Sequence, residues 1–147
     1  MLHKACGGKR TRRKSIHLTL AFIGETDDAN LARLKEAMRD VSGRAFAMSM
    51  DKSGYWHHNR IAWVGMNEIP EQLTRLVSAI EAAVRREGFS LDERPYFPHV
   101  TLLRQAGRPE ILPECEPLAW PVKEFTLAGS TPSGYAILGR WPLQVDA

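Results

Sequence analysis

Two short segments of the same pattern carry the side chains with which this chain could do chemistry. Residues 17–20 read His-Leu-Thr-Leu and residues 99–102 read His-Val-Thr-Leu. Histidine is the usual side chain for proton transfer near neutral pH, and a threonine hydroxyl can donate a hydrogen bond to a phosphoryl oxygen. Two histidines on opposite sides of one scissile bond would let one take a proton from water while the other protonates the leaving oxygen. The pair therefore indicates acid–base catalysis.

The same pattern does not indicate a metal site. Each segment supplies one imidazole, with no second histidine and no carboxylate at ligand spacing. We therefore expect no bound metal. The remaining alternative, two unrelated strand histidines that hydrogen-bond to their neighbours, requires the repeated pattern to be a coincidence.

Both segments have the composition of β-strands, over residues 16–23 and 99–104. Because side chains alternate between the two faces of a strand, the histidine and threonine of each segment should project to one side. The apolar residues of the pattern should then point into a core: Leu18, Leu20, Val100 and Leu102.

Further apolar patterns predict the elements that must position these strands. Helical spacing predicts one helix from Asp27 or Asp28 to Gly43 and another over residues 70–88. Few helices and a closing pair of strands favour an α+β or mixed-sheet architecture over a doubly wound parallel sheet. Alternating or compact apolar runs predict strands over 45–51, 60–66, 122–128 and 135–141, with a proline-containing loop over 105–119.

Length and composition limit the kind of protein. The chain has 147 residues, of which 44% are hydrophobic and 25% charged, as in one globular domain. It has no apolar run of about 18 residues that could span a membrane, and its first residues lack the apolar core of a secretory signal. Cys6 and Cys115 cannot form a disulfide framework and lack zinc-ligand spacing. We expect a cytoplasmic protein that does not bind membranes.

The net charge of +3 conceals a basic segment before His17. Six Lys or Arg residues and no acidic residue fall within the first 14 positions, whereas the rest of the chain carries more acidic than basic groups. Such a cluster can bind phosphates, or it can be a solvated and partly disordered leader.

The two segments and their flanks resemble those of the 2H phosphoesterases, in particular the RNA 2′,3′-cyclic phosphodiesterases, also called RNA 2′,5′-ligases. The matching stretches are residues 17–22, His-Leu-Thr-Leu-Ala-Phe, with Gly-Glu shortly after, and residues 98–104, Pro-His-Val-Thr-Leu-Leu-Arg. The resemblance extends over residues 2–143. It implies an α+β, bilobal fold with pseudo-twofold duplicated β/α halves around a central cleft.

This resemblance also implies a division of the chain. Residues 1–147 would form a single 2H phosphoesterase domain, with a basic leader over 1–15. The half with the first motif would span about 16–56, and the half with the second motif about 57–143.

The activity that the resemblance implies is hydrolysis of an RNA 2′,3′-cyclic phosphate end to a 2′-phosphomonoester, without a cofactor. Carried over by position, His17 would be the proton donor to the leaving ribose oxygen, and His99 the proton acceptor that activates water. Thr19 and Thr101 would hold the phosphate oxygens. Because symmetry relates the two histidines, their roles depend on the direction in which the substrate lies.

Two further positions match residues of the family that bind substrate. Phe22 matches an aromatic position that can stack on a base, and its alternative is packing in the core. Arg104 matches an arginine near the phosphate, and its alternative is a surface charge at the end of a strand.

The N-terminus departs from the family, which usually has a strand and a helix before the first motif. Only 16 residues precede His17. Residues 2–6 resemble the tail of such a helix, ending near Gly7 and Gly8. Without the first strand and most of the first helix, a sheet edge would be open. We expect lower stability than in a longer relative, or a dimer through this edge, although the family is expected to be monomeric.

Three other functions stay open. The chain could be a 2H enzyme for a small cyclic-phosphate nucleotide, an RNA-binding module without catalysis, or an inactive protein. His57 and His58, next to Tyr55 and Trp56, could line the cleft or form a polar turn.

Overall fold

The computed structural model describes residues 1–145 as two units, each assembled from separate parts of the chain. The first unit contains Met1–Thr19, Met48–Glu68 and Phe97–Trp120. The second contains the intervening segments and the chain from Pro121 onwards. The domain predicted from the sequence extends to residue 147, so its last two residues lie outside the described part.

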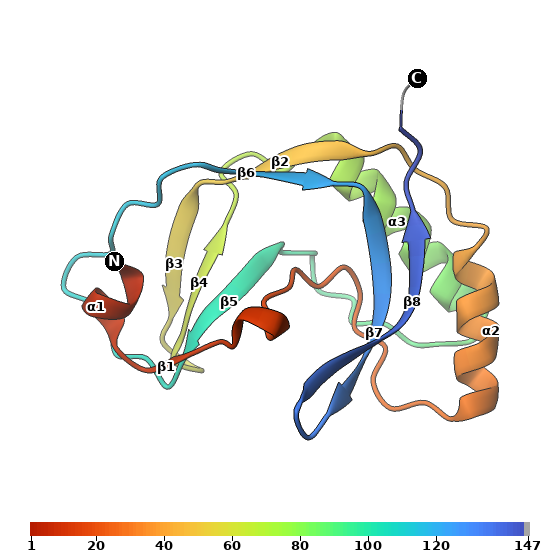
Figure 1. The fold of residues 1–147 in the computed structure, drawn as a ribbon, viewed down its shortest axis with the longest axis horizontal. Coiled ribbons are helices and arrows are strands. Elements are labelled where there is room, and N and C mark those ends of the chain that lie inside the picture. The colour runs from red at the N-terminus through yellow and green to blue at the C-terminus, as the bar shows by residue number, and fades with distance from the viewer. Residues whose placement is uncertain (146–147) are drawn as a thin grey trace. The chain divides into compact units, whose positions relative to one another are not determined.

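A four-stranded antiparallel sheet forms the framework of the first unit, in the order β1-β5-β4-β3 (Figure 1). The β4 sequence, Ile-Ala-Trp-Val-Gly, is rich in the β-branched and aromatic residues that favour strands. The β3 sequence, Lys-Ser-Gly-Tyr-Trp, carries that signal only in its last two residues, and its pairing with β4 extends the strand back to Lys52. The strands are β1 (Lys9–Arg10), β3 (Lys52–Trp56), β4 (Ile61–Gly65) and β5 (His99–Arg104).

One face of this sheet packs against the first helix. This helix, α1 (Leu2–Cys6), ends at Gly7, whose φ of 64° is a left-handed conformation that favours glycine. Helical structure over residues 2–6 is thus confirmed. The buried cluster behind the sheet consists of Cys6, Ala62, Leu103 and Ala106, with Leu2, Tyr55 and Leu102 packed against it.

Two helices and a hairpin form the second unit: α2 (Asp28–Met38), α3 (Glu71–Arg86), β7 (Glu124–Thr131) and β8 (Gly134–Pro142). The Asp27 carboxylate accepts a hydrogen bond of 2.8 Å from the Asn30 N–H, which caps α2 as predicted. This helix ends at Met38 rather than at Gly43. The apolar face predicted for α3 is buried: Leu73, Leu76, Val77, Ile80, Ala83 and Val84.

The strand predicted over residues 16–23 is wrong. A 3-10 turn, η1 (Arg13–Ser15), precedes this segment, and residues 16–23 form no strand in the described structure. Composition gives a segment its tendency to extend, but a strand also needs a neighbour with which to form a ladder of hydrogen bonds.

Two other strands, β2 (Phe46–Met50) and β6 (Leu118–Val122), pair as a separate two-stranded sheet, and the division between the units falls within both. Thus β6 begins inside the predicted loop over 105–119. Helices together with antiparallel strands nevertheless confirm the α+β class.

Candidate active site

The imidazoles of His17 and His99 are held in the same way. The His17 Nδ1 lies 2.7 Å from the carbonyl oxygen of Ser15, and the His99 Nδ1 lies 3.0 Å from that of Phe97. A carbonyl oxygen can only accept, so each Nδ1 carries the proton and donates it. The atom of each ring that can exchange a proton is therefore Nε2.

A β-bulge in β5 sets the direction of its side chains. Ala62 pairs with Leu103 and Trp63 pairs with Thr101, so Leu102 is an extra residue in β5. As a result, Val100 and Leu103 are both buried, each 2% exposed, whereas Leu102 is only partly buried. Leu102 nevertheless packs against the buried cluster of Cys6, Ala62, Leu103 and Ala106, so Val100 and Leu102 both contribute to the core as predicted.

The bulge also changes where Arg104 points. In a regular strand Arg104 would project to the face opposite that of His99 and Thr101, because their positions differ by odd numbers. The extra residue shifts the alternation by one and returns Arg104 to the face that carries His99 and Thr101. This face is called the histidine face below, and bulges next to functional sites often redirect a side chain in this way.

Aromatic side chains surround His99 on the histidine face. The Trp56 ring centroid is 4.6 Å from that of His99, with an interplanar angle of 70°. Phe97 and Trp63 lie at 6.0 Å and 6.5 Å from the same imidazole, and Trp56 also contacts both of them. The contacts of His99 with Trp56 and Trp63 are edge-to-face, an arrangement that aromatic rings prefer and that limits rotation of the imidazole.

A glycine makes room for this aromatic cluster. Gly54 lies directly opposite Trp63 across the β3–β4 pair, and a Cβ built on it would lie 2.1 Å from the Trp63 ring. Neither Trp56 nor Trp63 was predicted from the sequence to lie beside His99. A hairpin over residues 52–65 would have been the necessary signal, since it places both tryptophans on one face.

The turn that follows β5 accepts hydrogen bonds from the end of β3 and from the turn after it. The carbonyl oxygen of Ala106 accepts hydrogen bonds of 3.0 Å from both the Tyr55 hydroxyl and the Arg60 Nε. Arg60 and Gln105 have φ values of 57° and 54°, which non-glycine residues rarely adopt. Backbone strain of this kind persists only where neighbouring contacts hold it.

Five of the six predicted site residues belong to the first unit: His17, Thr19, His99, Thr101 and Arg104. His17 and Thr19 are exposed and lie outside any strand, whereas His99 and Thr101 are half-buried in β5. Phe22 belongs to the second unit and is 79% exposed, so it is not a core residue.

The other candidates from the sequence lie apart from this chemistry. His57 and His58 are exposed in the turn between β3 and β4, where the ring of His58 lies 6.2 Å from that of Trp56.

The two cysteines have raised pKa values. Burial raises the pKa of the Cys6 thiol, and burial together with Asp51 and Glu116 raises that of Cys115. Both thiols are therefore held in the less nucleophilic protonated form.

The described residues contain neither a cluster of metal-binding side chains nor a helix that could cross a membrane. No group of three or more His, Cys, Asp or Glu side chains that could hold a metal ion occurs within residues 1–145. Likewise, none of the helices in this part of the chain has the length and apolar character needed to cross a membrane.

Comparison with known proteins agrees with this geometry. The profile of a family described as LigT like Phosphoesterase matches residues 1–63 and again residues 64–137, in accord with a duplication. The RNA 2′,3′-cyclic phosphodiesterase of Escherichia coli strain K12 is 32% identical over 145 residues, which cover 92% of this chain and 80% of that protein. The protein of that name from Archaeoglobus fulgidus is 30% identical, over 71% of this chain and 61% of its own length.

A solved structure supports the same assignment. The crystal structure of E. coli LigT complexed with 3′-AMP matches with a TM-score of 0.86 and 31% identity, covering 97% of this chain and 84% of that one. The resemblance inferred from the two His-x-Thr segments is thus confirmed, together with the phosphoesterase fold that it implies. The chain belongs to the LigT-like phosphoesterase family.

Proposed function

We propose that this phosphoesterase hydrolyses RNA 2′,3′-cyclic phosphate ends to 2′-phosphomonoesters, with His17 and His99 as its acid and base. The observation that best supports this is the matched support of the two imidazoles, each with its Nδ1–H on a backbone carbonyl two residues upstream. We infer the substrate from the relatives named RNA 2′,3′-cyclic phosphodiesterase.

The reaction begins at His99. In its neutral form the ring carries its proton on Nδ1, so Nε2 offers a lone pair to a water molecule. As Nε2 takes the proton, the water oxygen forms a bond to phosphorus and the bond from phosphorus to the ribose O3′ breaks. The Trp56 indole and the Phe97 carbonyl fix the ring during this step.

His17 completes the reaction. Its imidazolium donates one N–H to the Ser15 carbonyl and the other, from Nε2, to the departing O3′. The products are a 2′-phosphate and a 3′-hydroxyl, and the two rings return to their starting states by exchanging protons with solvent. If the substrate lay in the opposite direction, with O3′ beside His99, the histidines would exchange roles and the product would again be a 2′-phosphate.

The remaining site residues bind the substrate. The Thr19 and Thr101 hydroxyls donate hydrogen bonds to the non-bridging phosphate oxygens, where charge increases in the transition state. Phe22 offers an exposed ring for stacking on the terminal base, and Arg104 contributes positive charge on the histidine face.

A product assay tests this function. A short RNA ending in a 2′,3′-cyclic phosphate and, separately, a 2′,3′-cyclic mononucleotide are incubated with the protein without added metal, and the phosphate position is mapped. We expect 2′-phosphate from the RNA, unchanged turnover with EDTA, and loss of turnover in His17→Ala and His99→Ala. The matched control is His57→Ala, which removes an exposed imidazole in the β3–β4 turn. Turnover that EDTA abolishes would contradict the two-histidine mechanism.

A further inference from the structure

Arg60 joins the turn after β3 to the turn after β5. Its Nε lies 3.0 Å from the carbonyl oxygen of Ala106, and its Nη2 lies 3.3 Å from that of Gln105. In return, the Ala106 N–H donates to the Arg60 carbonyl at 2.9 Å. Through its side chain and its main chain, Arg60 therefore binds the backbone of the two residues that directly follow Arg104.

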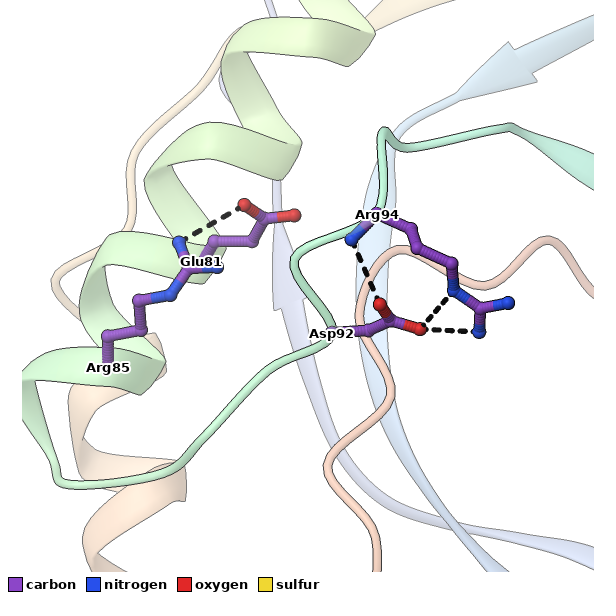
Figure 2. A network of polar contacts seen from close by, with 4 residues as sticks. All are labelled: Glu81, Arg85, Asp92 and Arg94. Carbon is purple, nitrogen blue, oxygen red and sulfur yellow. Dashed lines mark hydrogen bonds and ion pairs between the residues drawn. The ribbon is translucent and has the colours of Figure 1, made fainter.

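Two arginines of the second unit bind carboxylates instead. Figure 2 shows Arg85 at 3.5 Å from Glu81 on α3, and the Arg94 Nε at 2.7 Å from Asp92 in the loop that follows. Ion pairs at the surface contribute little to stability, because water solvates both partners when they separate. A guanidinium on two successive carbonyls holds the chain itself, since its planar fork matches a narrow range of backbone arrangements.

The two turns that Arg60 joins have uncommon backbone conformations. Arg60 and Gln105 have φ values of 57° and 54°, in the left-handed region. Such conformations cost free energy and persist only where contacts hold them, as the guanidinium and the Tyr55 hydroxyl do here through Ala106. Loss of the guanidinium should therefore let Gln105 relax toward a common φ, which moves the end of β5.

The middle of β5 is held independently of Arg60. The Thr11 N–H donates to the Leu102 carbonyl at 2.8 Å, and the Thr11 hydroxyl donates to the Thr101 carbonyl at 3.0 Å. The basic segment near the N-terminus is thus fixed along β5 at this point and is not a loose tail. Loss of the Arg60 contacts should therefore displace Arg104, the last residue of the strand, and leave Thr101 in place.

We propose that Arg60 is a positioning residue for Arg104, and through it for the phosphate that the site binds. The bulge at Leu102 places Arg104 on the histidine face, and Arg60 fixes the chain one and two residues further on. A displaced strand end would carry the Arg104 guanidinium away from the phosphate. This role of Arg60 rests on the proposed function, in which Arg104 contributes positive charge to the site.

Binding of 2′-AMP, which needs no turnover, tests this role in a double-mutant cycle. Calorimetry measures the Kd for the wild type, Arg60→Gly, Arg104→Ala and the double variant. Glycine adopts a φ near 57° without strain, so Arg60→Gly removes the guanidinium while its own backbone conformation stays favourable. We expect Arg60→Gly to weaken binding roughly fivefold on its own, and less than about twofold in the Arg104→Ala background.

Substitution by lysine separates the planar fork from the charge. Arg60→Lys keeps the positive charge but presents a single ammonium in place of the fork, so it should weaken 2′-AMP binding about as much as Arg60→Gly. The matched control is Arg85→Lys, which makes the same change at an arginine that binds a carboxylate in the second unit. It should leave the Kd within about twofold of the wild type.

Three results would overturn this role. Equal losses in the two backgrounds would mean that Arg60 acts on the ligand independently of Arg104. Wild-type affinity in Arg60→Gly, with only a lower Tm, would make Arg60 a purely structural residue. Wild-type affinity in Arg60→Lys would assign the effect to its charge. A wild type that binds 2′-AMP but hydrolyses no cyclic phosphate would contradict the proposed activity alone, and the cycle would still decide the role of Arg60.

Discussion

The Trp56 indole lies edge-on to the His99 imidazole, with ring centroids 4.6 Å apart. Together with the Phe97 carbonyl on Nδ1, this contact leaves the imidazole little freedom to rotate. Proton transfer depends on a hydrogen-bonding distance and direction that a rotated ring would lose. Trp56 therefore positions the imidazole of His99, which is the base in the proposed reaction.

For Trp56 we predict a loss in kcat with little change in KM. Trp56→Ala removes the ring contact and should lower kcat by roughly tenfold, while Trp56→Phe keeps an aromatic edge and should restore most of the activity. Steady-state kinetics on a cyclic-phosphate RNA measure both. If the KM rose in both variants while kcat stayed unchanged, Trp56 would instead contribute to substrate binding.

The two histidines predict a large loss of rate when either imidazole is removed. In the proposed reaction the His99 Nε2 takes a proton from water, and the His17 Nε2 gives one to the leaving oxygen. In His99→Ala we expect kcat/KM on a cyclic-phosphate RNA to fall by roughly a hundredfold or more, a common contribution of a general base. A fall of less than about tenfold would remove His99 from the acid–base machinery.

Much of the first unit could be predicted from local patterns. The apolar run of β4 predicts its strand, and the His-x-Thr pattern places His99 and Thr101 on one face, where the structure has them. These features depend on a few neighbouring residues and on the period of a strand. The apolar face of α3 was predictable for the same reason.

The remaining features depend on partners distant in the sequence. The bulge at Leu102 arises from the register between β4 and β5, so no pattern within β5 shows that Arg104 returns to the histidine face. The strand β3 exists through its pairing with β4, and Trp56 reaches His99 only through that pairing. Conversely, residues 16–23 have strand composition but form no strand, because propensity alone does not supply a partner.

The cysteines predict slow and pH-dependent thiol labelling. Burial raises the pKa of both thiols, and a raised pKa leaves less thiolate at neutral pH. Labelling should therefore become faster only above the pH range in which an ordinary thiol ionises. Cys115 is partly exposed and should react before the buried Cys6. Mass spectrometry of iodoacetamide-treated protein over a pH series measures this, with urea-unfolded protein as the control. Fast labelling of Cys6 in the folded protein at neutral pH would contradict its burial.

We predict that replacing Gly8 destabilises the protein through packing as well as through backbone conformation. Its φ is +86° and an added Cβ would lie 2.6 Å from the Arg104 carbonyl oxygen, whereas Gly24 has a φ of +83° and nothing within 4 Å. Alanine at either position should lower the free energy of unfolding by about 1 kcal/mol, because it must adopt a left-handed backbone conformation. Gly8→Ala should lower it by a further amount of about 2 kcal/mol, because the added Cβ must push β1 away from β5. Urea unfolding of the two variants isolates that difference. Equal destabilisation would mean that β1 does not approach β5 so closely, and the pairing of the two strands, in which Lys9 lies opposite Arg104, would lose its support.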